Sequence, residues 1–121
     1  RAHAYSIHVS KAISYISAHL HEKLTTQDIA DALSLNRSYL STLFHREIGK
    51  TLHQYLLSAK LQSAAQLLTT SEIPLSEIGA YYGFASQSHF IQCFQRETGL
   101  TPMEYRRKFY QRSEVSDSKN G

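Results

Sequence analysis

The sequence contains one segment twice, about fifty residues apart. Residues 38–51 read SYLSTLFHREIGKT and residues 88–101 read SHFIQCFQRETGLT, with a phenylalanine, an Arg-Glu pair, a glycine and a threonine at equivalent positions. Each copy follows a short apolar-patterned segment that ends in a turn, at residues 29–36 and 78–86. The repeat predicts two helix-turn-helix units, and this motif commonly places a helix in the major groove of DNA.

Length and composition are those of one small globular domain. The chain has 121 residues, of which 41% are hydrophobic. Because it has no apolar run of about eighteen residues and no secretion signal at its start, we expect no membrane span and a cytoplasmic location. A single cysteine, Cys93, excludes an internal disulfide and agrees with a reducing compartment. The chain begins with Arg1 rather than methionine, so we expect it to be a piece of a longer protein.

The basic charge is concentrated in the two repeats. The net charge is +3, which permits a polyanionic partner without requiring one. Residues 37–60 contain four Lys or Arg against one Glu, and residues 96–112 contain five against two. This distribution favours nucleic acid as the partner of the repeated units.

Apolar spacing and capping signals predict an all-α fold of seven helices. The first helix is expected from Ser6 or Ser10 to His21. The other six are expected at residues 25–33, 37–48, 51–69, 73–82, 87–98 and 101–110. Their predicted starts carry capping residues, namely Thr25, Asn36, Thr51, Ser86 and Thr101, and their predicted ends carry Gly49, Gly83 and Gly99.

These elements predict a division of the chain into four parts. Residues 6–50 form a first helix-turn-helix subdomain, 51–69 a linker helix and 70–110 a second helix-turn-helix subdomain. Residues 111–121 are polar and have too few apolar side chains to bury, so we expect a disordered tail.

The second helix of each repeat has an apolar face and a polar face when phased at about 100° per residue. Leu40, Leu43, Phe44 and Ile48 are expected to point inward, as are Phe90, Cys93 and Phe94. The outward faces carry short uncharged side chains in place of the Lys and Glu typical of a solvent face, and such groups can hydrogen-bond to base edges. A polar surface that contacts nothing is the alternative interpretation. The predicted base-reading residues are Arg37, Ser38, Ser41, Thr42, His45, Gln87, Ser88, Ile91, Gln92 and Gln95.

Phosphate contacts are expected from the helix starts and from the basic residues around them. Arg46 and Arg96 each precede a glutamate, so each has a structural salt bridge within its subdomain as an alternative role. Tyr39 and His89 flank the reading faces and rank second as base-reading residues. The predicted phosphate-binding residues are Asn36, Arg46, Lys50, Ser86, Arg96 and Arg106.

Three segments of the second half resemble the signature of the AraC/XylS family of bacterial transcription regulators: residues 83–90, 94–102 and 104–106. The first half, from Ile29 to Phe44, is similar to that family's first helix-turn-helix. The resemblance covers about residues 10–109. It implies a DNA-binding domain of seven helices, in which two recognition helices joined by a long helix enter successive major-groove segments of one asymmetric double-stranded operator. It also implies a preceding effector-sensing or dimerisation domain, and we expect RNA polymerase as a further partner.

Three positions depart from the family's pattern. Gly79 replaces the usual alanine inside the fifth helix, at a cost of about 0.5–1 kcal/mol relative to Ala, and close packing against the sixth helix would favour it. Pro74 replaces the usual capping hydroxyl, which leaves that helix start less well satisfied. Lys60 replaces the usual arginine in the long helix, where it is expected to meet a phosphate or a carboxylate.

Other chemistries find little support in the sequence. Seven histidines lack the spacing of metal ligands, and Cys93 falls on an inward apolar stripe, where a buried inert thiol is expected. Since no phosphate loop, Ser-x-x-Lys motif or carboxylate pair occurs in a credible setting, we expect no metal, no cofactor and no enzyme activity. The competing class is a helical protein-protein interaction module without DNA binding. The clustering of basic charge in the repeats counts against that class.

Overall fold

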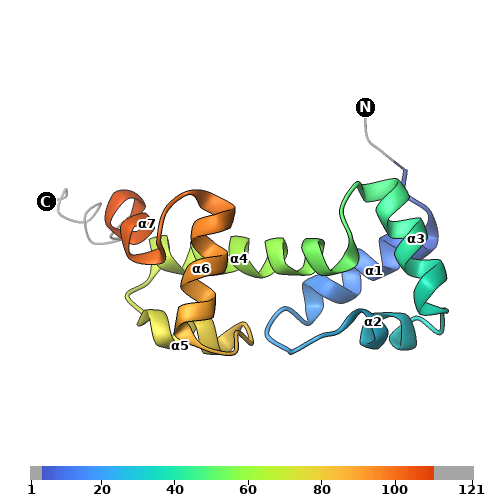
Figure 1. The fold of residues 1–121 in the computed structure, drawn as a ribbon, viewed down its shortest axis with the longest axis horizontal. Helices are drawn as coiled ribbons and strands as arrows, with labels where there is room; N and C mark the ends of the chain where they lie inside the picture. The colour runs from blue at the N-terminus through green and yellow to red at the C-terminus, as the bar shows by residue number, and fades with distance from the viewer. Residues whose placement is uncertain (1–3, 111–121) are drawn as a thin grey trace, which may run out of the picture. The chain divides into compact units, whose positions relative to one another are not determined.

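The computed structural model describes residues 4–110, and over these residues it contains helices and no strand (Figure 1). The predicted all-α fold of seven helices is therefore confirmed. The predicted tail at 111–121 lies outside the described residues. The helices are α1 (Ile7–Ala18), α2 (Thr26–Ala32), α3 (Arg37–Ile48), α4 (Leu52–Thr70), α5 (Leu75–Tyr81), α6 (Gln87–Thr98) and α7 (Pro102–Phe109).

The chain folds as two compact units that divide inside α4. One unit ends at Ala59 and the other begins at Lys60, so α4 contributes about half of its length to each. Unit 1 contains α1, α2 and α3, and unit 2 contains α5, α6 and α7. Each unit therefore holds one copy of the repeated segment, together with its own part of the long helix.

The two copies have the same local construction. α2 and α5 are both 7 residues long, and α3 and α6 are both 12. In the turn before α3 the backbone of Ser34 is left-handed, with φ 57°, and Gly83 takes the same role before α6, with φ 81°. The next amide then reaches back to the preceding helix, from Leu35 N to Ala30 O at 2.9 Å and from Phe84 N to Gly79 O at 3.0 Å.

Side-chain caps begin most of the helices, as the sequence predicts. Thr25 and Thr101 form complete capping boxes with Asp28 and Glu104. The pKa of Glu104 lies below its ordinary value, first because its carboxylate accepts a hydrogen bond from the Thr101 backbone amide and then because of the Thr101 hydroxyl. Pro74 gives α5 no side-chain cap, which confirms that this start is the less satisfied one.

Left-handed glycines end α3 and α6, as predicted. Gly49 and Gly99 have φ values of 88° and 86°, and their amides donate to the carbonyls of His45 and Gln95 at 2.9 and 2.8 Å. A residue with a side chain would be strained at this φ, so glycine fixes where each helix stops.

The first helix is shorter than predicted. It ends at Ala18 rather than at His21, because His19 leaves the helical region at φ −129° and ψ 28°. The His19 amide donates to Ile16 O at 3.1 Å, one residue short of the helical partner. The His19 ring also donates from Nδ1 to Tyr15 O at 2.7 Å, so it occupies a carbonyl that the next turn of helix would have used.

Each unit is held together by a core that includes the apolar face of its α3 or α6 helix. In unit 1, Leu40 and Phe44 are fully buried against Ile16 of α1 and Ile29 of α2. In unit 2, the fully buried side chains include Leu61, Leu68, Ile78, Phe90 and Phe94. Each such side chain contributes about 1.5–3 kcal/mol by leaving water. The predicted inward positions are confirmed, with Ile48 only half-buried and Cys93 buried.

Gly79 lies where α5 packs closely against α6. A Cβ at this position would lie 3.3 Å from the Cβ, Cγ and Cδ2 atoms of Phe90, which is itself fully buried. The predicted close packing against the sixth helix is thus present. It gives a physical reason for a glycine at a position where alanine would suit the helix better.

We expect Gly79→Val to lower the free energy of unfolding by about 1–3 kcal/mol, because its methyl groups would overpack the buried Phe90 ring. Urea titration followed by circular dichroism measures this. The matched control is Ala80→Val at the exposed neighbouring position, which tests only the helix propensity of valine. Equal losses for the two variants would show that contact with Phe90 is not the cause.

Candidate nucleic-acid interface

The outward face of α3 brings the predicted reading residues of unit 1 together. Ser38, Thr42 and His45 are exposed and Ser41 is half-buried. Arg37 is exposed at the first position of the helix. The face is accessible because Leu40, Leu43 and Phe44 on the opposite side are committed to the core.

The outward face of α6 has the same layout with different chemistry. Ser88, Gln92 and Gln95 are exposed, and Gln87 is exposed at the first position. Ile91 is half-buried, so it lies at the boundary between this face and the core. The α6 face therefore offers carboxamides where the α3 face offers hydroxyls, an imidazole and a guanidinium.

Asn36 and Ser86 hold the starts of the two helices in matching ways. The Asn36 side-chain oxygen accepts from Tyr39 N at 3.0 Å, and the Ser86 hydroxyl oxygen accepts from His89 N at 3.0 Å. The amides of the first helical residues have no acceptor within the helix, and the Asn36 amide and Ser86 hydroxyl hydrogens remain available as donors. These groups can donate to an anion.

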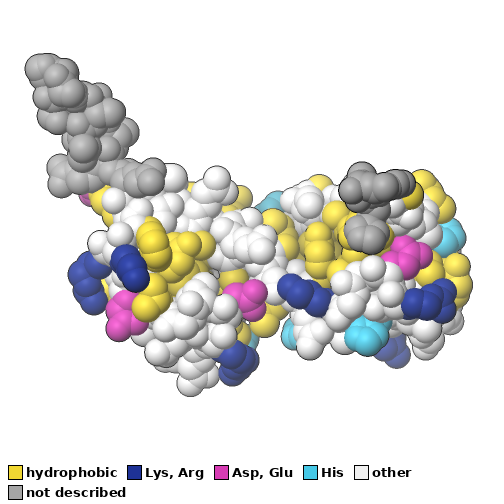
Figure 2. Space-filling view, turned by 90° about the horizontal axis from the view of Figure 1, so that it is seen from above, with side chains coloured by type: hydrophobic (Ala, Val, Ile, Leu, Met, Phe, Trp, Pro, Cys, Tyr) yellow, Lys and Arg dark blue, Asp and Glu magenta, His cyan; other side chains and the backbone are white. Residues whose placement is uncertain are grey.

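Arg46 and Arg96 are exposed, and Arg46 does not pair with the neighbouring Glu47. The Glu47 carboxylate accepts instead from the Ser6 amide at 2.9 Å, which ties the start of α1 to α3. Within residues 4–110, neither Arg46 nor Arg96 forms a salt bridge. The described part of the chain therefore lacks the salt bridges that were the alternative role of these two arginines. Figure 2 shows Lys and Arg side chains spread over the face drawn, with acidic side chains beside some of them.

Arg106 is turned toward α4. Its Nε donates to the Leu68 carbonyl at 3.1 Å, and its Nη2 is buried. This contact restricts the predicted phosphate role, since only part of the guanidinium remains for a ligand. The next two residues, Arg107 and Lys108, are exposed on the same helix and were not singled out by the sequence. The sequence feature that could have indicated them is the basic run 106–108, but such a short run usually marks an ordinary solvated helix face.

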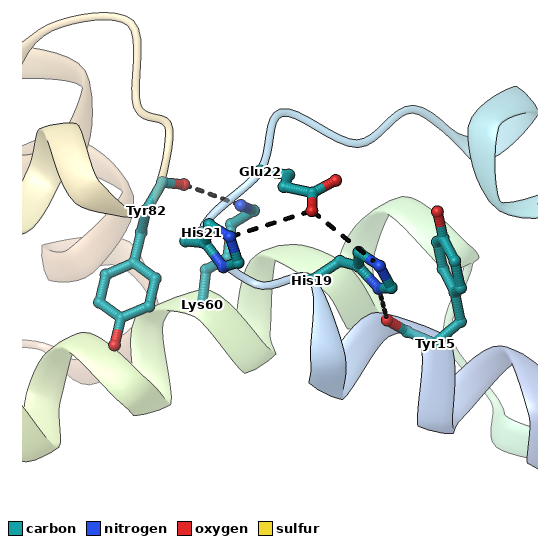
Figure 3. A network of polar contacts seen from close by, with 6 residues as sticks. All are labelled: Tyr15, His19, His21, Glu22, Lys60 and Tyr82. Carbon is teal, nitrogen blue, oxygen red and sulfur yellow. Dashed lines mark hydrogen bonds and ion pairs between the residues drawn. The ribbon is translucent and has the colours of Figure 1, made fainter.

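Lys60 has a hydrogen-bond partner within the fold. It is buried, and its Nζ donates to the Tyr82 carbonyl at 2.8 Å (Figure 3). Tyr82 is the C-cap of α5, so the ammonium lies at the negative end of that helix, where a cation is stabilised. From the sequence we expected a phosphate or a carboxylate here and did not predict this carbonyl contact.

The histidines near the end of α1 form a small polar cluster in unit 1. His19 Nε2 and His21 Nε2 lie 4.0 and 3.9 Å from one oxygen of Glu22 (Figure 3). The His19 ring also stacks on Tyr15 at 4.0 Å between centroids. The part of the chain that the structure describes contains no group of three His, Cys, Asp or Glu side chains able to hold a metal ion.

None of the helices described is long and apolar enough to cross a membrane.

We expect Lys60→Met to lower the free energy of unfolding by about 1–3 kcal/mol, because it leaves the Tyr82 carbonyl without its donor. The control is Lys50→Met, the same substitution at an exposed site, which should change the free energy by less than about 0.5 kcal/mol. Urea titration of the three proteins measures both. If the Lys60→Met protein were as stable as the wild type, the hydrogen bond from Lys60 to the Tyr82 carbonyl would not stabilise the fold.

Comparison with known sequences identifies related chains. The sequence model of a family described as "Helix-turn-helix domain" matches residues 29–108. The "Probable transcriptional regulator LumQ" of Photobacterium leiognathi is 37% identical over 92 residues, which are 76% of this chain and 37% of that protein. The chain thus spans little more than a third of the length of this relative.

Two solved structures share the fold over most of their length. The C-terminal domain of AraT, a response regulator from Geobacillus stearothermophilus, has a TM-score of 0.86 at 30% identity, over 90% of this chain and 91% of that one. A transcriptional regulator of Chromobacterium violaceum, described as an AraC-type DNA-binding domain-containing protein, has a TM-score of 0.81 at 32% identity, over 86% and 93% of the two chains.

Proposed function

The chain belongs to the AraC/XylS family of helix-turn-helix transcription regulators, and we propose that it binds a double-stranded DNA operator through phosphate contacts and reads base edges with α3 and α6. The family is one of DNA-binding regulators rather than of enzymes. The observation that carries the proposal is the matching construction of these two helices. Each follows the same turn, buries its apolar side and exposes short uncharged groups suited to the major groove.

Base reading is assigned to the exposed faces. Arg37 can form a bidentate contact to guanine, whereas Gln87, Gln92 and Gln95 pair best with adenine. The exposed edge of Ile91 suits a thymine methyl group. We therefore expect the DNA under α6 to be rich in A·T pairs and the DNA under α3 to contain guanine. The remaining proposed reading residues are Ser38, Ser41, Thr42, His45 and Ser88.

Phosphate contacts are assigned to the exposed donors around these faces. Arg46, Lys50 and Arg96 are exposed cations, and Asn36 and Ser86 retain side-chain donors beside the first helical amides. The assignment extends to two more cations on α7, Arg107 and Lys108. For Arg106 it is limited to Nη1, because Nε is engaged by Leu68 and Nη2 is buried.

The regulator acts as part of a longer protein in this proposal. The match to LumQ covers 37% of that relative, and the AraT structure is the C-terminal domain of a response regulator. We propose that an effector-sensing or dimerisation domain precedes the chain in the full protein. We also propose that RNA polymerase is a partner of the DNA-bound form and that the protein works in the cytoplasm.

Binding should depend strongly on salt. If about six phosphates are neutralised, affinity should fall about a thousandfold between about 50 and 200 mM salt, at a slope of roughly −0.9 per contact. Fluorescence anisotropy with random duplex DNA measures the slope. A flat response would contradict the phosphate assignment and favour a protein-interaction module instead.

Base reading and phosphate binding should respond differently to mutation. Gln92→Ala should cost about 1–3 kcal/mol on the preferred sequence and relax selection at one or two base pairs, whereas Lys50→Ala should weaken all sequences about equally. Selection from a random DNA pool, repeated with each variant, measures both. The matched control is Gln66→Ala, at an exposed glutamine of α4 outside the reading faces. If Gln92→Ala lowered affinity for random and selected DNA to the same degree, α6 would not be reading bases.

A further inference from the structure

The third residue of α3 and of α6 carries an exposed ring that a second ring holds edge-on. Tyr39 is 50% exposed, and the His8 ring lies 5.8 Å from it between centroids at an interplanar angle of 79°. His89 is exposed, and the Phe84 ring lies 5.7 Å from it at 64°. Each pair is T-shaped, a geometry that aromatic rings favour. Two exposed side chains that would otherwise sample several rotamers are thus restrained.

The supporting rings come from unrelated positions in the two units. His8 lies in the first turn of α1, two residues after Ser6, whose amide donates to the Glu47 carboxylate of α3. Phe84 lies in the turn before α6, where it also packs against the buried Phe90 at 5.1 Å. The first unit has Leu35 at the position of Phe84, as the matching backbone bonds show. The same restraint on the same helical position therefore does not follow from the sequence repeat alone.

The restrained rings lie at one edge of each reading face. Residue 39 is offset from residue 38 by about 100° around the helix, and the exposed Arg46 is offset from Tyr39 by only about 20°. His89 and Arg96 repeat this arrangement on α6. A helix lying in the major groove points the centre of its exposed face at the bases and the edges of that face at the two DNA phosphate backbones. Within residues 4–110, neither the Tyr39 hydroxyl nor the His89 ring nitrogens have a hydrogen-bond partner.

We propose that the Tyr39 hydroxyl and a ring N–H of His89 donate hydrogen bonds to DNA phosphates at equivalent points of the two half-sites. In this proposal His8 and Phe84 are positioning residues, which act on DNA only through the rings that they hold. Restraint before binding reduces the rotamer entropy that is lost when the contact forms. The inference rests on the proposed DNA-binding function and adds two contacts and two supporting residues to it.

Phenylalanine substitutions test the contacts, because they keep each ring and its edge-on neighbour and remove only the donor. Tyr39→Phe and His89→Phe should each weaken binding about tenfold, the size expected for a hydrogen bond to a charged group. The loss should be the same for selected and for random duplex DNA. An unchanged affinity, or a loss confined to the selected sequence, would overturn the assignment of a backbone contact.

Double-mutant cycles test the positioning residues. His8→Ala should weaken binding by the wild type but have no further effect in the Tyr39→Phe background, because the contact that it supports is already absent. Phe84→Leu, which introduces the residue that the first unit has at this point, should behave in the same way with His89→Phe. Equal losses in both backgrounds would indicate a general structural role and refute the positioning role.

Two measurements separate the possible failures. Thermal unfolding of each variant shows whether it is folded at the assay temperature. Binding of random duplex DNA by the unmodified chain tests the proposed function itself, so an absence of binding there would refute that function. If the wild type binds DNA and the two phenylalanine variants bind it with the same affinity, only the proposed contacts of Tyr39 and His89 would be refuted.

Discussion

Burial of one side of a twelve-residue helix is the constraint on which both units depend. Phe44 in α3, and Phe90 and Phe94 in α6, are fully inaccessible to solvent. Because these residues recur at helical spacing, fixing them in the core also fixes the rotation of the helix about its axis. The opposite side is then presented to solvent in a defined orientation. The proposed contact with base edges needs such an orientation. Apolar packing supplies it while burying only Ser41 and Ile91 of the proposed reading residues in part.

The remaining elements of each unit hold that helix at its ends. Asn36 and Ser86 cap the starts, while Gly49 and Gly99 stop the helices by taking a left-handed conformation. Further restraints come from outside the helix-turn-helix. In unit 1, Glu47 binds the Ser6 amide, and in unit 2 Lys60 binds the carbonyl that ends α5. In both cases a charged side chain meets a backbone group at a helix end, where the unpaired amides or carbonyls and the helix dipole favour it.

The two units use one backbone plan to present different chemistry. The turn before each reading helix contains a left-handed residue, serine in one case and glycine in the other. The same turn carries a leucine in the first unit and a phenylalanine in the second, and only the phenylalanine supports a neighbouring ring. On the proposed reading faces, α3 carries hydroxyls and an imidazole at positions where α6 carries mainly carboxamides. Two faces of unlike chemistry favour recognition of an asymmetric DNA sequence rather than a palindrome.

The sequence by itself determined the number of helices, most of their ends and the inward face of α3 and α6. These features depend on capping residues, glycines and apolar spacing within a few residues of one another, so local rules suffice. The predicted C-terminal end of α1 was wrong, because the His19 ring donates to the Tyr15 carbonyl and so competes with the backbone amide that would continue the helix. Only the tertiary structure decided the partner of Lys60, the engagement of Arg106 on Leu68 and the pairing of His8 with Tyr39. Each of these contacts joins residues more than twenty positions apart, and which distant groups meet is set by how helices pack, not by any spacing along the chain.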